Sequence, residues 1–149
     1  MSGRPGTGGT DAELPVLTTM EELLAEVARP EEVYVRHSKG PEHDAARTSV
    51  DYESGVRLPG LSVNPLSPPS WWTRPPADWV ARQVRSYAHL TGETGNRTWL
   101  LFGRVIGRGP DNEPLVDRVQ PLAWLHDELL ITARRWYEAR FDVGRATAG

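Results

Sequence analysis

Two apolar runs separated by a short polar loop are the feature that most constrains how this chain can fold. The runs cover residues 98–106 and 115–124, and residues 107–114 between them are rich in Gly, Pro, Asp and Asn. Alternating apolar runs of this length are typical of strands, and such a loop is typical of a turn. Because a short loop joins neighbouring antiparallel strands, the sequence predicts a β-hairpin here.

The rest of the chain alternates between helical and extended patterns. Thr18 or Thr19 begins a capping box with Glu21 or Glu22, which predicts a helix that ends before Pro30. Residues 32–38 read as a strand, and two further short strands flank a turn at residues 59–60. Further helices are predicted over residues 78–90, capped by Asp78, and over residues 127–141. This order predicts an α+β fold with a mixed or antiparallel sheet and about three helices, one sheet face being covered by helices.

The length of 149 residues fits a single domain. Residues 1–13 carry Gly, Thr and Ser without an apolar anchor, so we expect a disordered tail. The single α+β domain is expected over residues 14–143, and residues 144–149 are expected to fray.

Composition excludes several classes of function. The chain has no cysteine, which rules out disulfides, thiolate catalysis and cysteine-ligated zinc. Its net charge of −3 with mixed signs lacks the basic footprint of a nucleic-acid-binding protein. No apolar run approaches the length of a membrane span, and the N-terminus lacks the apolar segment of a signal peptide. We therefore expect a cytoplasmic protein whose partner is a small molecule or a protein, with no membrane or nucleic acid involved.

A proline-rich connection, residues 66–76, carries the neighbouring indoles of Trp71 and Trp72. A rigid backbone that presents two indoles suits a planar ligand or a sugar. The same residues also suit a structural role in which the indoles cover the edge of the core. The first alternative predicts a non-catalytic module that binds a small ligand or a protein through this loop.

The histidines give a weaker hypothesis. His37 and His43 lie near Asp51 and Glu53 in the sequence, which is the residue chemistry of an acid–base pair. No two-histidine helical spacing and no EF-hand spacing occurs, so the sequence predicts no metal site.

Three residues in chain order form the sharpest functional hypothesis. Arg36 stands near the end of an early strand, Ser62 on a middle strand, and Glu113 at the mouth of the second hairpin strand. Asp111 precedes Glu113 by two residues. A structural alternative is that Asp111 and Asn112 only form the turn and that Glu113 is a solvated flank.

This order resembles the arginine–serine–glutamate pattern of the ADP-ribosyltransferase fold. The resemblance implies that NAD is a substrate, that Arg36 orients it, that Ser62 supports the site, and that Glu113 is catalytic. Asp111 occupies the position that selects the acceptor, and we expect Asn64 and Trp71 to complete the NAD contacts. The sequence departs from the family pattern in three places, one of which is Asp111, where the family usually has Gln or Glu. Residues 62–64 read Ser-Val-Asn in place of Ser-Thr-Ser, and a proline directly follows Glu113.

A second resemblance covers more of the chain, residues 32–125. The segments YVRHSKGPEHD, LPGLSVNPL, WW and GRGPDNEPLV look like those of an uncharacterised family of small actinobacterial proteins. This resemblance implies no activity. We expect the loops at residues 38–60, 64–76 and 107–114 to gather at one sheet edge and form a pocket.

Overall fold

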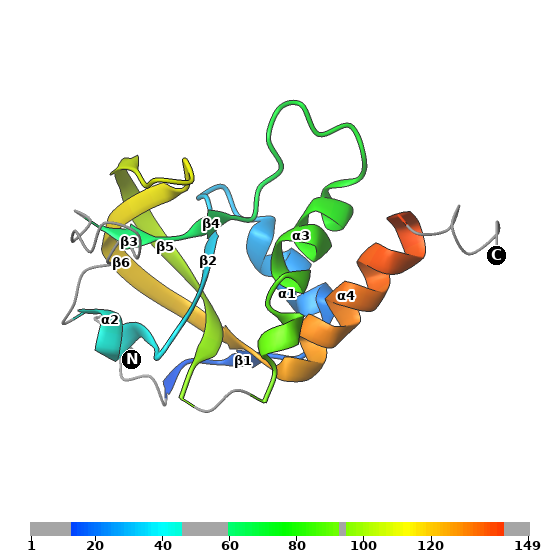
Figure 1. Cartoon of the computed structure of the whole chain (residues 1–149), viewed down its shortest axis with the longest axis horizontal. Helices are drawn as coiled ribbons and strands as arrows, with labels where there is room; N and C mark the ends of the chain where they lie inside the picture. Colours follow the sequence, from blue (N-terminus) through cyan, green and yellow to red (C-terminus); the bar gives the residue numbers. More distant parts are fainter. Residues whose placement is uncertain (1–12, 46–59, 93–94, 142–149) are drawn as a thin grey trace.

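A curled mixed sheet with helices packed on one side makes up the fold (Figure 1). The computed structural model describes residues 13–45, 60–92 and 95–141. Within these residues the sheet has the strand order β1-β6-β5-β2-β4, with β3 paired to β6. The elements are β1 (Val16–Leu17), α1 (Met20–Val27), β2 (Tyr34–Ser38), α2 (Pro41–Ala45), β3 (Leu61–Ser62), β4 (Asn64–Pro65), α3 (Pro76–Arg85), η2 (Ala88–Leu90), β5 (Arg97–Arg108), β6 (Pro114–Leu125) and α4 (Asp127–Phe141).

The hairpin of β5 and β6 is the predicted one, and its strands run further into the loop than the sequence pattern indicated. Arg108 pairs with Pro114, which leaves only residues 109–113 to make the turn. The backbone N–H of Gly109 donates to the carbonyl of Glu113 at 2.8 Å, and Asn112 adopts a left-handed φ of 63°. Asparagine tolerates this conformation better than most residues, which explains the sharp reversal.

A short segment at residues 61–65 closes the sheet on itself. Its first part pairs with β6, so that Ser62 lies opposite Leu115. Its second part pairs with β2, so that Asn64 lies opposite Val35. Strand β5 already lies between β6 and β2. The segment pairs with these same two strands, and the sheet therefore curls towards a small barrel. The closure brings β2, β3 and the hairpin loop together.

Two apolar cores lie on opposite faces of the sheet. The larger packs the sheet against α1, α3 and α4, and the smaller fills the inside of the curl around Trp99, Leu101 and Val116. Leu100 points to the first core, and its neighbours Trp99 and Leu101 point to the second. All three are fully buried, so this part of β5 is buried on both faces. Burying each such side chain contributes roughly 1.5–3 kcal/mol.

The helices show one confirmed cap and one wrong one. Thr19 accepts the backbone N–H of Glu22, and the Glu22 carboxylate accepts the N–H of Thr19, both at 3.2 Å, which is the predicted capping box. Backbone N–H groups of Thr18 and Thr19 lower the pKa of Glu22.

The prediction that Asp78 caps α3 is wrong. The cap position is Pro75, which makes no side-chain cap. The Asp78 carboxylate is buried and accepts from Trp136 Nε1 at 2.9 Å and Arg140 Nε at 3.0 Å. A buried carboxylate needs such partners, so Asp78 ties α3 to α4 instead.

Several predicted segments lie outside the described residues. These are the N-terminal tail up to residue 12, the first short strand before Pro59, the acids Asp51 and Glu53, and the C-terminal end from residue 142. Within the stretch predicted to be irregular, residues 39–60, the described part contains the short helix α2.

Candidate functional site

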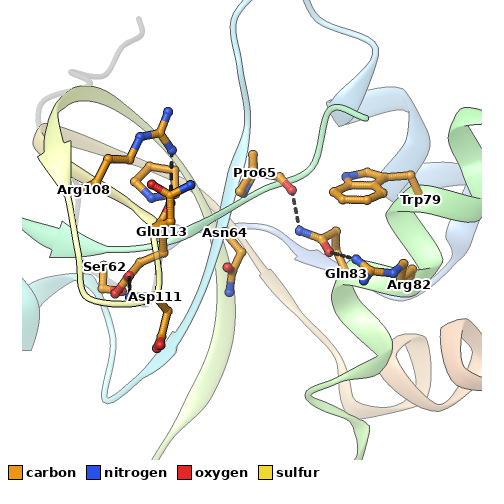
Figure 2. A pocket seen from close by; sticks show the side chains of 11 residues that line it. Ser62, Asn64, Pro65, Trp79, Arg82, Gln83, Arg108, Asp111 and Glu113 are labelled. Carbon is orange, nitrogen blue, oxygen red and sulfur yellow. Dashed lines mark hydrogen bonds between the residues drawn. The ribbon is translucent and has the colours of Figure 1, made fainter. Parts of the chain in front are cut away.

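Ser62 and Glu113 meet at the wall of a cleft of about 400 Å³ (Figure 2). The Ser62 hydroxyl donates to Glu113 Oε2 at 2.7 Å. The other carboxylate oxygen, Oε1, accepts the backbone N–H of Asp111 at 3.0 Å. Two donors from different segments therefore fix the carboxylate in one orientation, although its side chain is only partly buried.

The hairpin turn leaves space for this carboxylate because residue 109 is glycine. A Cβ added at Gly109 would overlap the Glu113 carboxyl group. The same loop provides the backbone N–H of Asp111. The turn therefore does more than reverse the chain, because its backbone and its missing side chain both set the direction of Glu113.

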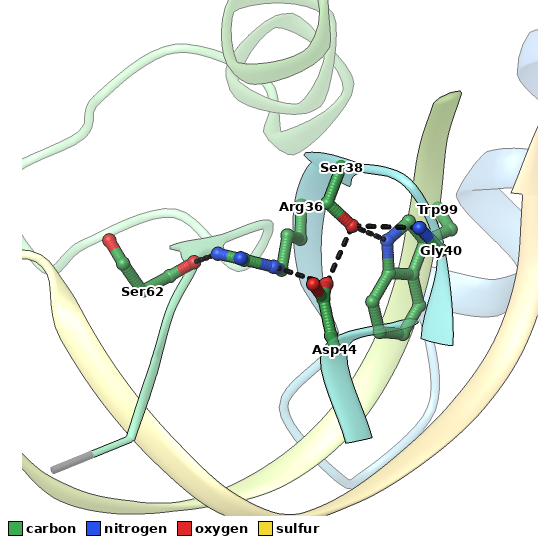
Figure 3. Close-up of polar contacts among 6 residues, drawn as sticks. All are labelled: Arg36, Ser38, Gly40, Asp44, Ser62 and Trp99. Atoms are coloured by element: carbon green, nitrogen blue, oxygen red, sulfur yellow. Dashed lines mark hydrogen bonds and ion pairs between the residues drawn. The ribbon is translucent and has the colours of Figure 1, made fainter. Parts of the chain in front are cut away.

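Arg36 holds the backbone of Ser62 in place (Figure 3). Its Nη1 donates to the Ser62 carbonyl oxygen at 2.7 Å, and its Nε donates to Asp44 Oδ2, also at 2.7 Å. Asp44 in turn accepts the hydroxyl of Ser38 at 2.6 Å, and Ser38 accepts Trp99 Nε1 at 3.0 Å. We call Arg36, Ser38, Asp44 and Trp99 the inner network. It anchors β3, and with it Ser62, to β2 and the smaller core.

The structure thus brings the three predicted residues together. Arg36, Ser62 and Glu113 form one continuous row of hydrogen bonds between β2, β3 and the hairpin loop. Their proposed catalytic roles stay predictions. Ser62 and Glu113 line the cleft. Arg36 is not among the lining residues, and its Nε and Nη1 groups donate to Asp44 and to Ser62.

Asn64 also lines the cleft, as predicted for a ligand contact. Its Nδ2 donates to the Tyr87 hydroxyl at 2.8 Å. Burial raises the pKa of Tyr87, and its ring stacks on His37 with centroids 5.8 Å apart. The bond from Asn64 to Tyr87 therefore links a cleft-lining residue to the helical layer.

Trp71 and Trp72 differ in their surroundings. Trp71 is 67% exposed and is not among the cleft-lining residues, but its ring meets the edge of Trp79, which does line the cleft. Trp72 is half-buried against Trp79 and Phe141, and its Nε1 donates to the Pro75 carbonyl. Trp72 therefore covers the core, and Trp71 presents its surface to solvent.

The sequence analysis missed the α3 wall of the cleft, which is formed by Trp79, Arg82 and Gln83, and it also missed Arg108 at the end of β5. Trp79 and Arg82 are three residues apart on one helix and therefore share a face. That spacing was a usable signal. The signal was not recognised because Trp79 is also one of the buried apolar residues of α3.

The histidine hypothesis stays a prediction, because its acids Asp51 and Glu53 lie outside the described residues. His37 Nδ1 lies 2.8 Å from Thr98 Oγ1, and alternation along β2 places it on the face opposite Arg36. Among the described residues no group of three or more metal-ligating side chains occurs.

The fold and the cleft together define an α+β protein with an arginine–serine–glutamate row at a polar cleft. Residues 10–147 match a family of unknown function, DUF6098, and the chain belongs to this family. No curated protein and no solved structure matches the chain. In the described ranges, no helix is both long and apolar enough to cross a membrane.

Proposed function

We propose that this protein binds NAD in the cleft and cleaves the bond between nicotinamide and ribose, passing ADP-ribose to water or to an acceptor. The observation that carries this proposal is the row of hydrogen bonds from Arg36 through Ser62 to Glu113, which ends at the cleft. Residues 26 and 51 positions apart in the chain meet there.

The chemistry needs a fixed negative charge beside the ribose. When the bond from ribose C1′ to the nicotinamide nitrogen breaks, the electron pair leaves with nicotinamide and positive charge develops on the ribose. The Glu113 carboxylate, fixed by Ser62 and by the N–H of Asp111, is suited to face that charge. The attacking oxygen or nitrogen then forms a bond to C1′ and releases its proton to solvent water. A preorganised electrostatic group of this kind is worth about 10²–10³ in rate.

Arg36 has a different role here from the one that the resemblance implies. Its guanidinium is paired with Asp44 and supports the backbone of Ser62, so we assign it as a positioning residue. Ser62 contributes on both sides, since its carbonyl accepts from Arg36 and its hydroxyl donates to Glu113.

The test is nicotinamide release from NAD by the wild-type protein and by Glu113→Gln. Glutamine keeps an oxygen that can accept the Ser62 hydroxyl but removes the charge. We expect release to fall at least about 100-fold, with the melting temperature unchanged. Glu138→Gln on the exposed face of α4 is the matched control and should keep full activity. Absence of release with water and with a panel of acceptors, together with no NAD binding at millimolar concentration, would refute the proposal.

A second candidate function has one observation in its favour, the 67% exposure of Trp71. A large aromatic side chain on a proline-rich loop is an economical anchor for a partner. In that case the protein is a binding module and NAD is not consumed. Acrylamide quenching of tryptophan emission should drop in Trp71→Ala, with Trp72→Phe as the control. Equal quenching in wild type and Trp71→Ala counts against this candidate.

A further inference from the structure

We propose that Arg82, assisted by Arg108, forms a phosphate-binding subsite at the far end of the cleft, so that the ligand is a phosphorylated riboside. The inference rests on the proposed function, since it assigns the part of that ligand that Glu113 does not contact. It also assigns to helix α3 part of the ligand orientation that the resemblance implied for Arg36.

Arg82 is held in position by neutral groups, and no carboxylate in the described part of the chain pairs with it. Its Nη1 donates to Gln83 Oε1 at 3.1 Å, and Gln83 is fixed in turn by donating to the Pro65 carbonyl at 2.9 Å. The guanidinium lies over the ring of Trp79, 5.0 Å from its centroid. These neutral contacts fix the position of the cation while leaving its charge unneutralised. A planar, preorganised guanidinium is the preferred protein group for binding phosphate.

Some of the other arginines in the described part of the chain are paired with acids, whereas others, such as Arg134 and Arg135, have no ion pair there. Arg36 pairs with Asp44, and Arg104 pairs with Asp117. Asp78 pairs with both Arg74 and Arg140. Among the same residues no carboxylate lies within ion-pair distance of Arg82 or of Arg108. The two arginines that line the cleft are therefore available to an anionic ligand.

Arg108 stands on the opposite wall, at the end of β5 (Figure 2). Its contact with a described residue is a long one, from Nη1 to the Asn112 carbonyl at 3.4 Å. It is exposed, so a bound phosphate can recruit it at little cost. Arg82 is the anchor of the subsite, and Arg108 is the adjustable second donor.

Electrostatics orients the ligand. Glu113 and Asp111 line the same hairpin side of the cleft as Arg108, and their carboxylates repel a phosphate, so the phosphate sits on Arg82 and Arg108 reaches it from across the cleft. The ribose therefore faces Glu113 and the phosphate turns towards Arg82 on α3. The volume of about 400 Å³ lies within the roughly 300–1,000 Å³ range of small-molecule sites.

The experiment compares nicotinamide mononucleotide with nicotinamide riboside, which lacks the phosphate, by isothermal titration calorimetry. We expect the wild-type protein to bind the mononucleotide at least about tenfold more tightly, as charge-assisted hydrogen bonds imply. The preference should vanish in Arg82→Gln/Arg108→Gln. The matched control Arg134→Gln/Arg135→Gln removes the same charge from the exposed face of α4 and should keep the preference.

Further variants keep the test decisive. Arg108→Gln alone changes an exposed side chain, so it should fold normally and reduce the preference in part. Glu113→Gln should retain the preference, because it leaves the phosphate end intact. Equal affinity for the two ligands in the wild type, binding of neither, or an unchanged preference in the double variant would overturn the subsite. A preference for the mononucleotide in a protein that neither binds NAD nor releases nicotinamide from it, with water or with the acceptor panel, would instead leave the subsite standing and refute the proposed function.

Discussion

Arginines occupy two contrasting regions of this molecule, the inner network and the α3 wall of the cleft. In the inner network, Arg36 is 17% exposed and bound to Asp44, which is 6% exposed. On the α3 wall, Arg82 is positioned only by neutral groups. A paired, buried arginine fixes a backbone, whereas an unpaired arginine at a cleft is free to recognise a ligand. The environment, not the residue type, decides the role.

The largest expected effect tests the inner network. Asp44→Ala leaves Arg36 without its carboxylate and Ser38 without its acceptor. Removing one partner of a buried ion pair costs about 3–5 kcal/mol, so the midpoint of urea unfolding should fall sharply. Asp117→Ala, which breaks the exposed pair with Arg104, is the control and should change stability little. Similar losses in the two variants would erase the contrast between a structural pair and a surface pair.

A smaller effect on stability, with a large one on activity, is expected from Gly109→Ala. The added methyl group would overlap the Glu113 carboxylate, which is the end of a flexible side chain and can move. We expect stability to change by less than about 1 kcal/mol, as for most surface substitutions, while nicotinamide release falls because Glu113 loses its contact with Ser62. Gly107→Ala is the control, since nothing lies within 4 Å of the added atom. Full activity in Gly109→Ala would show that the orientation of Glu113 does not matter.

The smallest effect concerns the contribution of Tyr87 to stability at high pH. Burial raises the pKa of Tyr87 above its ordinary value of 10.0, so the unfolded chain releases this proton first. The stability that protonated Tyr87 contributes to the folded state is complete below pH 10. It is lost as the pH rises through the folded-state pKa of Tyr87. Thermal melts between pH 9 and 11 should show a shallower decline for Tyr87→Phe than for wild type. Parallel declines would mean that Tyr87 does not titrate differently in the two states.

The parts of the fold that the sequence predicted are those set by local patterns. The hairpin and the capping box at Thr19 follow from alternation and from residues within one turn of each other. The cap predicted at Asp78 was wrong because its partners, Trp136 and Arg140, lie on another helix. At Asp78, the cost of burying a carboxylate without partners outweighs the local preference for a helix cap.

The site was predicted in part, for a related reason. Glu113 and Ser62 were identified from their order along the chain, but their contact depends on the segment 61–65 pairing with two different strands. No local pattern encodes that closure. The cleft residues Trp79 and Arg82 were missed because α3 reaches the cleft only after the helical layer has packed on the sheet.

The bridging segment at residues 61–65 also has a consequence for the order of folding. The hairpin contacts are local, whereas the bond from Arg36 to Ser62 spans 26 residues and the bond from Ser62 to Glu113 spans 51. Contacts of long sequence separation carry a larger loop-closure entropy and tend to form late. The hairpin and the helices can therefore assemble before the row of hydrogen bonds exists. Under mild denaturation the same segment should detach first, so that the cleft is lost while most of the secondary structure persists.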